Sequence, residues 1–409
     1  MHWPLSFVFV LCLGLGACGS ESPAPQTPPP QQPQPPMPPQ APQTATPRLP
    51  DGPHVGILVG FDELTVTSYD QPARVAALLA EARAAGSTIA RVQFDWRSIE
   101  PSRGVYERAD VEDALQSAMN DGDYIFVTFE TIDIAEAVFP DYLLGPDGLL
   151  AEGLTLSSPE VLDALEDVLE FLVPILGSAQ VWGIALGNEV DAYTNDGLGE
   201  INDMVTFFER AGQVVNRIDP DIATTVTLTV GAPVDQPALA EGILDAMEIA
   251  SFNHYCLTQD ILVTADEADW QDYFDRMKLF ADGKDIFVQE LGCPTGFGDD
   301  GAGAPPRPAN GLGGSPQIQA DYFTFVLEAF ATDPQLRATT IWQLLDWSPQ
   351  LATSFSAPTR AVNTVVGDRL DEWLATSGVC RWSDGTCRPA WDAVLQGIEA
   401  IEQARPAVP

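Results

Sequence analysis

The stretch VWGIALGNE, from Val181 to Glu189, is an apolar run too short for a typical helix, and it ends in an acidic residue. A second run of the same kind, DIFVQE, extends from Asp285 to Glu290. Short, nearly continuous apolar runs are typical of parallel strands that are buried on both faces. Both runs therefore predict buried strands, and each strand leads into a glutamate.

Further segments of the same character occur along the chain and alternate with helical patterns. The candidate strands are at residues 54–61, 88–94, 124–129, 181–186, 223–230, 248–253, 285–289 and 339–344. The helical patterns are at residues 72–85, 157–172, 204–218, 237–247, 270–281, 317–331 and 389–403. This alternation predicts an α/β fold, a (β/α)8 barrel of the TIM type. A doubly wound open sheet is the alternative, although no Gly-x-Gly-x-x-Gly motif follows the first candidate strand.

The first 50 residues differ in composition from the rest of the chain. Residues 1–17 form a short apolar segment that ends in Leu15-Gly16-Ala17, directly before Cys18. This ending resembles the cleavage box of bacterial lipoproteins, which implies a signal peptide and lipidation of Cys18; an ordinary secretory signal is the alternative. Residues 18–50 are mostly Pro, Gln, Ala and Thr, which predicts an extended tether. We therefore expect residues 51–405 to be an exported domain, anchored by lipid to a bacterial membrane, on the periplasmic side of the outer membrane or at the cell surface.

The chain is strongly acidic, with a formal net charge of −40. Its lysines are Lys278 and Lys284. Such a surface repels nucleic acid and anionic lipid, so we expect no nucleic-acid partner and no membrane contact except through the anchor. A polyanionic substrate is disfavoured for the same reason. We expect the protein to be a monomer.

Four cysteines remain once the leader and the lipidation site are set aside. An even number of cysteines in an exported chain favours disulfides. Cys380 and Cys387 flank a turn, whereas Cys256 and Cys293 follow two strands that a barrel would place side by side. We predict the pairs Cys256–Cys293 and Cys380–Cys387. A zinc site is the alternative, but paired Cys-x-x-Cys motifs are lacking.

In a barrel of this type, the active site lies at the carboxyl ends of the strands. The candidate side chains there are Arg91, Asp95, Trp96, Glu130, Asn188, Glu189, Asn253, Tyr255, Glu290 and Trp342. Neither lysine lies in a candidate strand, which disfavours Schiff-base chemistry, and the shortage of histidine disfavours metal-dependent hydrolysis. We expect no metal and no cofactor. Two carboxylates flanked by aromatic rings are the arrangement that glycoside hydrolysis uses, because rings stack on the apolar faces of sugars.

At these positions the chain resembles clan A of the retaining glycoside hydrolases, in the style of families 5, 39 and 42. The resemblance rests on Asn188-Glu189 after the fourth strand and on Glu290 after the seventh. It also rests on the segment RVQFDWRSIEPSRG at residues 91–104 and on the ending at residues 379–390. It covers about residues 54 to 402 and implies a (β/α)8 barrel that acts on oligo- or polysaccharides.

The resemblance implies a role for several residues. Glu290 would be the nucleophile and Glu189 the acid/base, which gives retention through a covalent glycosyl intermediate. Asn188 would bind the sugar 2-hydroxyl. Arg91 and Tyr255 would contact Glu290, and Trp342 would form the floor of the −1 subsite.

Some residues keep two interpretations. Trp96 is either a sugar platform or part of the loop after the second strand, and Glu130 is either a subsite residue or structural. His254, which lies where many such proteins have His-x-Tyr, is offset by one position and is expected to be structural. Trp182 has the opposite parity from Glu189 and is predicted to face the helices.

We therefore predict a retaining O-glycosidase that hydrolyses β-linked neutral glycans by double displacement. A non-catalytic carbohydrate-binding lipoprotein on a barrel scaffold is one alternative, and a transglycosidase is another.

Overall fold

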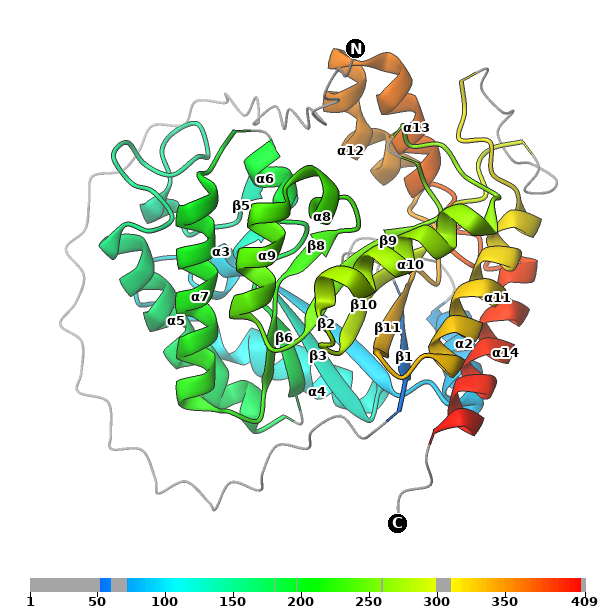
Figure 1. The fold of residues 1–409 in the computed structure, drawn as a ribbon, viewed down its shortest axis with the longest axis horizontal. Coiled ribbons are helices and arrows are strands. Elements are labelled where there is room, and N and C mark those ends of the chain that lie inside the picture. The colour runs from blue at the N-terminus through cyan, green and yellow to red at the C-terminus, as the bar shows by residue number, and fades with distance from the viewer. Residues whose placement is uncertain are drawn as a thin grey trace.

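The computed structural model describes residues 52–59, 72–179, 181–195, 197–258, 260–298 and 310–405. The predicted signal peptide, the lipidation site Cys18 and the tether lie outside these residues. The described residues form a barrel with surrounding helices (Figure 1).

A parallel sheet forms the barrel. Its strands are β1 (His54–Leu58), β2 (Ile89–Asp95), β3 (Tyr124–Glu130), β6 (Val181–Ala185), β7 (Ala223–Thr225), β8 (Thr227–Thr229), β9 (Ala250–Tyr255), β10 (Ile286–Gly292) and β11 (Leu336–Trp342). Their order is β7-β6-β3-β2-β1-β11-β10-β9-β8. Because Val226 alone separates β7 from β8, these two are halves of a single strand that pairs with β6 on one side and β9 on the other. The eight predicted strands and the (β/α)8 barrel are confirmed.

Helices surround the barrel (Figure 1). They are α2 (Pro72–Ala85), α3 (Trp96–Ile99), α4 (Arg108–Asp121), α5 (Pro159–Gly177), α6 (Asp191–Asn195), α7 (Ile201–Ile218), α8 (Ala232–Asp235), α9 (Pro237–Ala246), α10 (Glu267–Ala281), α11 (Pro316–Thr332), α12 (Pro349–Val362), α13 (Thr364–Leu374) and α14 (Pro389–Ala404). The seven predicted helices are present with small shifts at their ends. Six further helices in the described part of the chain, which were not predicted, are the short α3, α6 and α8 and the longer α4, α12 and α13.

Large apolar side chains fill the barrel near the amino ends of its strands. Phe126, Trp182 and Phe287 pack together, with ring centroids of Phe126 and Trp182 5.1 Å apart and those of Trp182 and Phe287 5.7 Å apart. Ile89 and Ala338 complete this buried cluster. Each such side chain contributes roughly 1.5–3 kcal/mol when it is fully buried. This end of the barrel is therefore packed core.

The position of Trp182 corrects the sequence-based expectation that it faces the helices. Strand β6 ends at Ala185, so residues 186–189 do not alternate as a strand does, and the parity of Glu189 does not extend back to Trp182. Trp182 consequently points into the barrel.

The next layer inside the barrel is polar. It contains the side chains of Arg91, Thr128, Thr227, Ser251 and Gln289, all of which are buried. Buried polar groups are stable only when they are hydrogen-bonded. Here Arg91 donates to Thr128, Thr128 and Thr227 donate to Gln289, and Thr227 bonds to Ser251.

Strand β10 contains one extra residue relative to both of its neighbours. Val288 pairs with Phe252 and Glu290 with Asn253, so Gln289 has no opposite residue in β9. The pairing with β11 shifts at the same place. Thr340 donates its hydroxyl hydrogen to the carbonyl oxygen of Gln289. Such a bulge interrupts the alternation of side chains, so that two successive residues face the same side of the sheet.

A buried ion pair joins the end of the last strand to the final helix. Arg388 donates to both carboxylate oxygens of Asp346, at 2.9 and 2.8 Å. The backbone N–H of Gly378 donates to the same carboxylate at 2.9 Å, and Arg388 also donates to the carbonyl of Gly378. Both oxygens of the Asp346 carboxylate are therefore hydrogen-bonded, to the guanidinium of Arg388 and to the backbone of Gly378.

A buried carboxylate, Glu372 in α13, holds two distant backbone positions. Its Oε1 accepts from the N–H of Phe297 at 2.5 Å, and its Oε2 accepts from the N–H of Leu312 at 2.9 Å. The helix pair α12 and α13, at the top of Figure 1, is thus tied to the two positions that flank residues 298–311.

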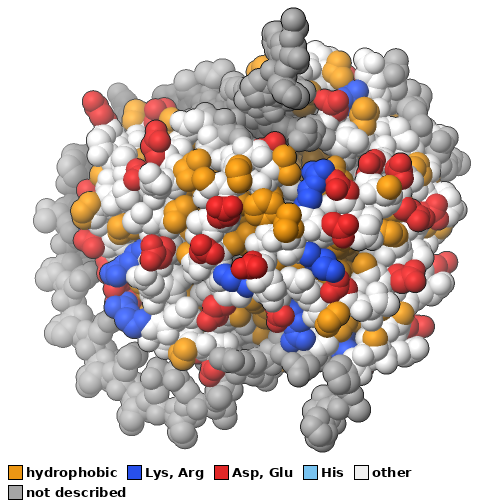
Figure 2. All heavy atoms as spheres, in the orientation of Figure 1, with side chains coloured by type: hydrophobic (Ala, Val, Ile, Leu, Met, Phe, Trp, Pro, Cys, Tyr) orange, Lys and Arg blue, Asp and Glu red, His pale blue; other side chains and the backbone are white. Residues whose placement is uncertain are grey.

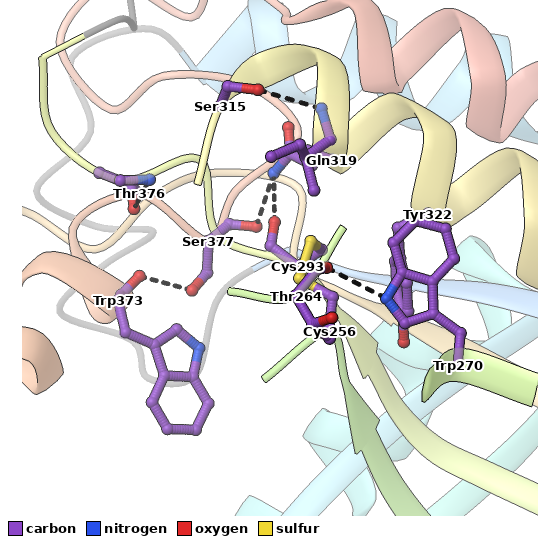
Figure 3. The surroundings of a disulfide bond; sticks show 12 residues. Cys256, Thr264, Trp270, Cys293, Ser315, Gln319, Tyr322, Trp373, Thr376 and Ser377 are labelled. Carbon is purple, nitrogen blue, oxygen red and sulfur yellow. Dashed lines mark hydrogen bonds between the residues drawn. A yellow bond between two sulfur atoms is a disulfide. The ribbon is translucent and has the colours of Figure 1, made fainter. Parts of the chain in front are cut away.

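Both predicted disulfides are confirmed. Cys256–Cys293 joins the chain just after β9 to the chain just after β10, and Cys380–Cys387 closes the turn before α14. Figure 3 shows Gln319 of α11 beside the first bond, where it donates to the carbonyl of Cys293 at 2.7 Å. These four cysteines are therefore in disulfides, so their sulfur atoms are not available as thiolate ligands of the zinc site that was the alternative.

Acidic side chains are spread over the face shown in Figure 2, with fewer basic ones between them. This distribution accords with the formal net charge of −40. Among the described residues, no helix combines the length and the apolar composition that a membrane span requires.

Candidate active site

The predicted site residues meet at the carboxyl end of the barrel. Glu290 lies in the bulged part of β10, where it pairs in register with Asn253 of β9. Asn253 donates to Glu189, which follows β6. The strands thus bring together two glutamates that are a hundred residues apart in the chain.

Glu290 is held at both of its oxygens. Arg91 Nη1 donates to Oε1 at 2.9 Å, and the hydroxyl of Tyr255 donates to Oε2 at 2.5 Å. Both predicted contacts of Glu290 are confirmed. Burial raises the pKa of Tyr255 well above 10, and the nearby charge of Glu290 adds to the effect, so Tyr255 remains a hydrogen donor.

Glu189 has a different environment. Asn253 Nδ2 donates to its Oε1 at 2.9 Å. Burial raises the pKa of Glu189 to about 8, and the charge of Glu290 is the next largest cause. The hydrogen bond from Asn253 acts in the opposite direction. Glu189 therefore holds a proton at neutral pH beside a carboxylate that is paired with an arginine.

The backbone at Glu189 adopts a left-handed conformation, with φ of 46°. Ile134 does the same, with φ of 55°, next to the bridge between Asp133 and Asn188. Each such residue costs about 1–2 kcal/mol when it is not glycine. Strain of this kind persists where the surrounding structure fixes the backbone, and it clusters at functional sites.

Asn188 is fixed by three neighbours. Its Oδ1 accepts from Gln289 Nε2 at 2.9 Å and from Asn253 Nδ2 at 3.1 Å. Its Nδ2 donates to Asp133 Oδ1 at 2.9 Å. The side chain is therefore held in one orientation beside Glu189.

Carboxyl groups form the wall of the site on the side of β2 and β3. Glu130 lies opposite Asp95 in register, and Asp133 lies three residues beyond the end of β3. Burial raises the pKa of Glu130 well above 4.5, with Asp133 and Asp95 as the next causes. Burial also raises the pKa of Asp133 to about 7. Glu130 thus lies where a subsite residue was predicted, and its role in binding stays a prediction.

Aromatic rings gather on the opposite side. Trp342, at the end of β11, lies edge-on to Tyr255 with ring centroids 5.6 Å apart. Trp373 from α13 lies 4.9 Å from the ring of Tyr255. Trp342 is placed as the resemblance implies, and its contact with a sugar stays a prediction.

Trp96 corrects the interpretation that made it a sugar-binding residue. Its side chain is fully buried, packed against Phe129 and Phe139, and its Nε1 donates to Glu100 at 2.9 Å. A ring without exposed surface cannot stack on a sugar. Trp96 instead opens the short helix α3 and closes the loop after β2.

His254 is structural, as expected. It is fully buried, its Nδ1 bonds to the hydroxyl of Tyr322, and burial lowers its pKa to about 3. A histidine that stays neutral in this way adds no charge to the site.

Asp133, Asn253 and Gln289 had no predicted role, although each contacts Asn188. A signal existed for two of them. Asn253 has the same parity as Tyr255 in β9, and Gln289 is a polar residue directly before Glu290 in a strand that is otherwise apolar. Asp133 lies in the two-residue strand β4 (Ile132–Asp133), which is too short to show periodicity.

No protein-family model matches the sequence, and a search of curated proteins finds no match. Solved structures do match it. A GH5_18 protein from Streptomyces cattleya, in complex with GlcNAc, has a TM-score of 0.62 at 16% identity, over 88% of this chain and 82% of that one. A GH5_18 protein from Bifidobacterium longum subsp. longum has a TM-score of 0.64 at 14% identity, over 88% and 81%. The native xylanase 10B from Thermotoga maritima has a TM-score of 0.55 at 14% identity, over 86% and 97%. At identities this low, the likeness establishes the shared barrel fold.

Proposed function

We propose that this protein is a retaining glycosidase that hydrolyses β-linked glycans. The observation that carries the proposal is the difference in environment between two neighbouring carboxyl groups, those of Glu290 and Glu189. Glu290 is held by Arg91 and Tyr255, whereas Glu189 has its pKa raised to about 8. A nucleophile and a general acid require this difference.

In the first step, Glu290 attacks the anomeric carbon and Glu189 protonates the departing glycosidic oxygen. The bond from carbon to the leaving group breaks as the bond to Glu290 forms. Because Glu290 then carries the sugar as a neutral ester, its charge no longer raises the pKa of Glu189. In the second step, Glu189 takes a proton from water, the water oxygen bonds to the anomeric carbon, and Glu290 is released.

Neighbouring residues would bind the sugar in the −1 subsite. Asn188 would donate to the 2-hydroxyl, and Trp342 would stack on the ring. Glu130, in the acidic wall, would accept hydrogen bonds from hydroxyls further from the reacting carbon.

Two of the structural neighbours suggest the first substrates to test. GH5_18 variants with a glutamate changed to alanine, from Streptomyces cattleya and Bifidobacterium longum, bind Manβ1-4GlcNAc. A further neighbour is an exo-beta-1,4-mannosidase from an Opitutaceae bacterium. We therefore place β-mannosides and Manβ1-4GlcNAc first in a panel that also contains β-glucosides, β-xylosides and polysaccharides.

The test is hydrolysis of this panel by the wild-type protein and by Glu290→Ala. We expect the variant to lose turnover and azide to restore it as a glycosyl azide of inverted configuration. Proton NMR of the wild-type product should show retained configuration. Binding without turnover in the wild-type protein would favour the carbohydrate-binding alternative. Transfer to an added acceptor sugar, in preference to water, would favour the transglycosidase.

We also propose that Cys18 carries a lipid that anchors the domain to a bacterial membrane. The support is the sequence Leu15-Gly16-Ala17-Cys18 and the proline-rich stretch that follows it. The test is incorporation of a labelled fatty acid during expression in bacteria. A signal that persists unchanged in Cys18→Ala would overturn this assignment.

A further inference from the structure

Gln289 is a buried polar residue that the proposed reaction does not use. It is the extra residue of the bulge in β10, and its side chain is fully buried inside the barrel. Its Nε2 donates to Asn188 Oδ1 at 2.9 Å. Its Oε1 accepts from the hydroxyls of Thr227 at 2.9 Å and Thr128 at 3.3 Å. Both ends of the amide are thus bonded, each to a different part of the site.

The direction of these hydrogen bonds is set by Arg91, because a guanidinium donates and never accepts. Arg91 Nε donates to the hydroxyl of Thr128 at 3.0 Å. The Thr128 oxygen is an acceptor in that bond, so its own hydrogen points to Gln289. The amide oxygen of Gln289 therefore faces Thr128, and its NH2 group faces Asn188.

The orientation of Asn188 follows from that of Gln289. Since Gln289 and Asn253 both donate to Oδ1 of Asn188, its Nδ2 is turned the other way and donates to Asp133. An amide nitrogen carries two hydrogens. One is used by Asp133, and the second is the donor that the 2-hydroxyl of a bound sugar requires. A reversed Asn188 would place its carbonyl oxygen against the carboxylate of Asp133.

We propose that Gln289 is a positioning residue that transmits the donor direction set by Arg91 to Asn188, so that Asn188 presents N–H to the 2-hydroxyl of the substrate. This inference rests on the proposed glycosidase function. Gln289 itself does not touch the sugar. The bulge in β10 makes the arrangement possible, because it turns Gln289 inward together with Glu290.

The central experiment is Gln289→Glu, which replaces the donor NH2 with an acceptor oxygen of the same size. The probes are the 2,4-dinitrophenyl β-glycoside that the wild-type protein hydrolyses and its 2-deoxy analogue. Hydrogen bonds to the 2-hydroxyl supply several kcal/mol in the transition state, so the wild-type kcat/KM ratio of the two probes should be on the order of 10²–10³. In Gln289→Glu we expect this ratio to fall to within about tenfold of one, mainly through slower hydrolysis of the 2-hydroxy probe. A ratio equal to the wild-type value would overturn the proposal.

A second variant separates lost direction from added charge. Gln289→Met keeps the length of the side chain and removes the donor without adding a carboxylate. Asn253 still donates to Asn188 in this variant, so we expect the ratio to fall by less than in Gln289→Glu. If Gln289→Glu does not fold, an unchanged ratio in Gln289→Met overturns the proposal in its place.

The matched control is Gln319→Glu. Gln319 is also fully buried, and its Nε2 donates to the backbone carbonyl of Cys293 at 2.7 Å (Figure 3). It also donates to the carbonyl of Gly378 at 3.1 Å. We expect this variant to be less stable in urea, yet to keep the wild-type ratio of the two probes. An equal fall in both variants would mean general loosening and would overturn the proposal. A wild-type protein that hydrolyses no glycoside would instead overturn the proposed function itself.

Discussion

Two arginine–carboxylate pairs are buried to the same degree in this barrel, yet their surroundings differ. In both pairs the arginine side chain is 1% exposed and the carboxylate side chain 5% exposed. Asp346 receives two bonds from Arg388 and one from the backbone of Gly378. Glu290 receives one bond from Arg91 and one from Tyr255, and its charge also acts on Glu189 and Asp133. Burial and pairing with an arginine are therefore common to both carboxylates, and what distinguishes Glu290 is the further carboxyl groups beside it.

The largest expected effect is on activity, in Glu290→Gln. We expect kcat/KM to fall by roughly 10⁴-fold or more, because loss of a nucleophile removes the covalent route. Its effect on stability should be smaller than that of breaking the other pair, since removal of the charge also relieves repulsion with Asp133, whose pKa is raised partly by Glu290. Kinetics on an activated aryl glycoside, together with urea denaturation, measure both quantities. Retention of more than a tenth of the wild-type rate would contradict the assignment.

The corresponding change in the other pair, Asp346→Asn, should act on stability. It removes the charged partner that Arg388 contacts at 2.8 Å, and breaking a buried ion pair typically costs about 3–5 kcal/mol of unfolding free energy. Below the unfolding transition, we expect kcat within about twofold of wild type. A large loss of kcat in folded protein, with little loss of stability, would show that the two pairs are not functionally distinct.

Glu189→Ala tests the carboxyl group beside Glu290, which is what distinguishes this ion pair from that of Asp346. General acid–base catalysis contributes roughly 10²–10⁴-fold. We expect a loss in that range for substrates with poor leaving groups. The first step on dinitrophenyl glycosides should change little, because this leaving group needs no proton. Equal losses for both substrate classes would argue against Glu189 as the acid.

The smallest effects concern pH. Because Glu189 must be protonated as general acid, kcat/KM should fall as pH rises through about 8. Its pKa is raised on folding, so its contribution to stability is fully present below the unfolded value near 4.5 and is lost as pH rises through about 8. In Glu290→Gln, the pKa of Glu189 should move down but stay above its ordinary value, since burial is the larger cause. Carbon NMR titration of labelled glutamate measures the shift, and an unchanged pKa would argue against electrostatic coupling.

Much of the fold and part of the site could be predicted because the evidence for them is local. Several of the eight strands are nearly continuous apolar or β-branched runs, and the strand count places Arg91, Tyr255 and Glu290 on one rim. Once those side chains share a rim, their mutual contacts follow from charge and reach.

The failures concern places where strand alternation stops. Parity predicts that Trp182 faces the helices only if the strand continues to Glu189, but β6 ends at Ala185. The inward position of Gln289 depends on a bulge, which forms only through pairing with strands that are distant in sequence. Trp96 begins a helix directly after β2, so strand parity does not describe it. Helices α12 and α13 interrupt what reads in sequence as a loop. Each of these depends on contacts that local patterns do not encode.

Glu372 accepts hydrogen bonds from both Phe297 and Leu312, and this has a consequence for how the sequence between them can vary. These two residues flank residues 298–311, and the same carboxylate of α13 binds the backbone of both. The entropic cost of closing a loop grows only slowly with its length. We therefore expect changes in length or sequence between Phe297 and Leu312 to leave the geometry around Glu290 in place.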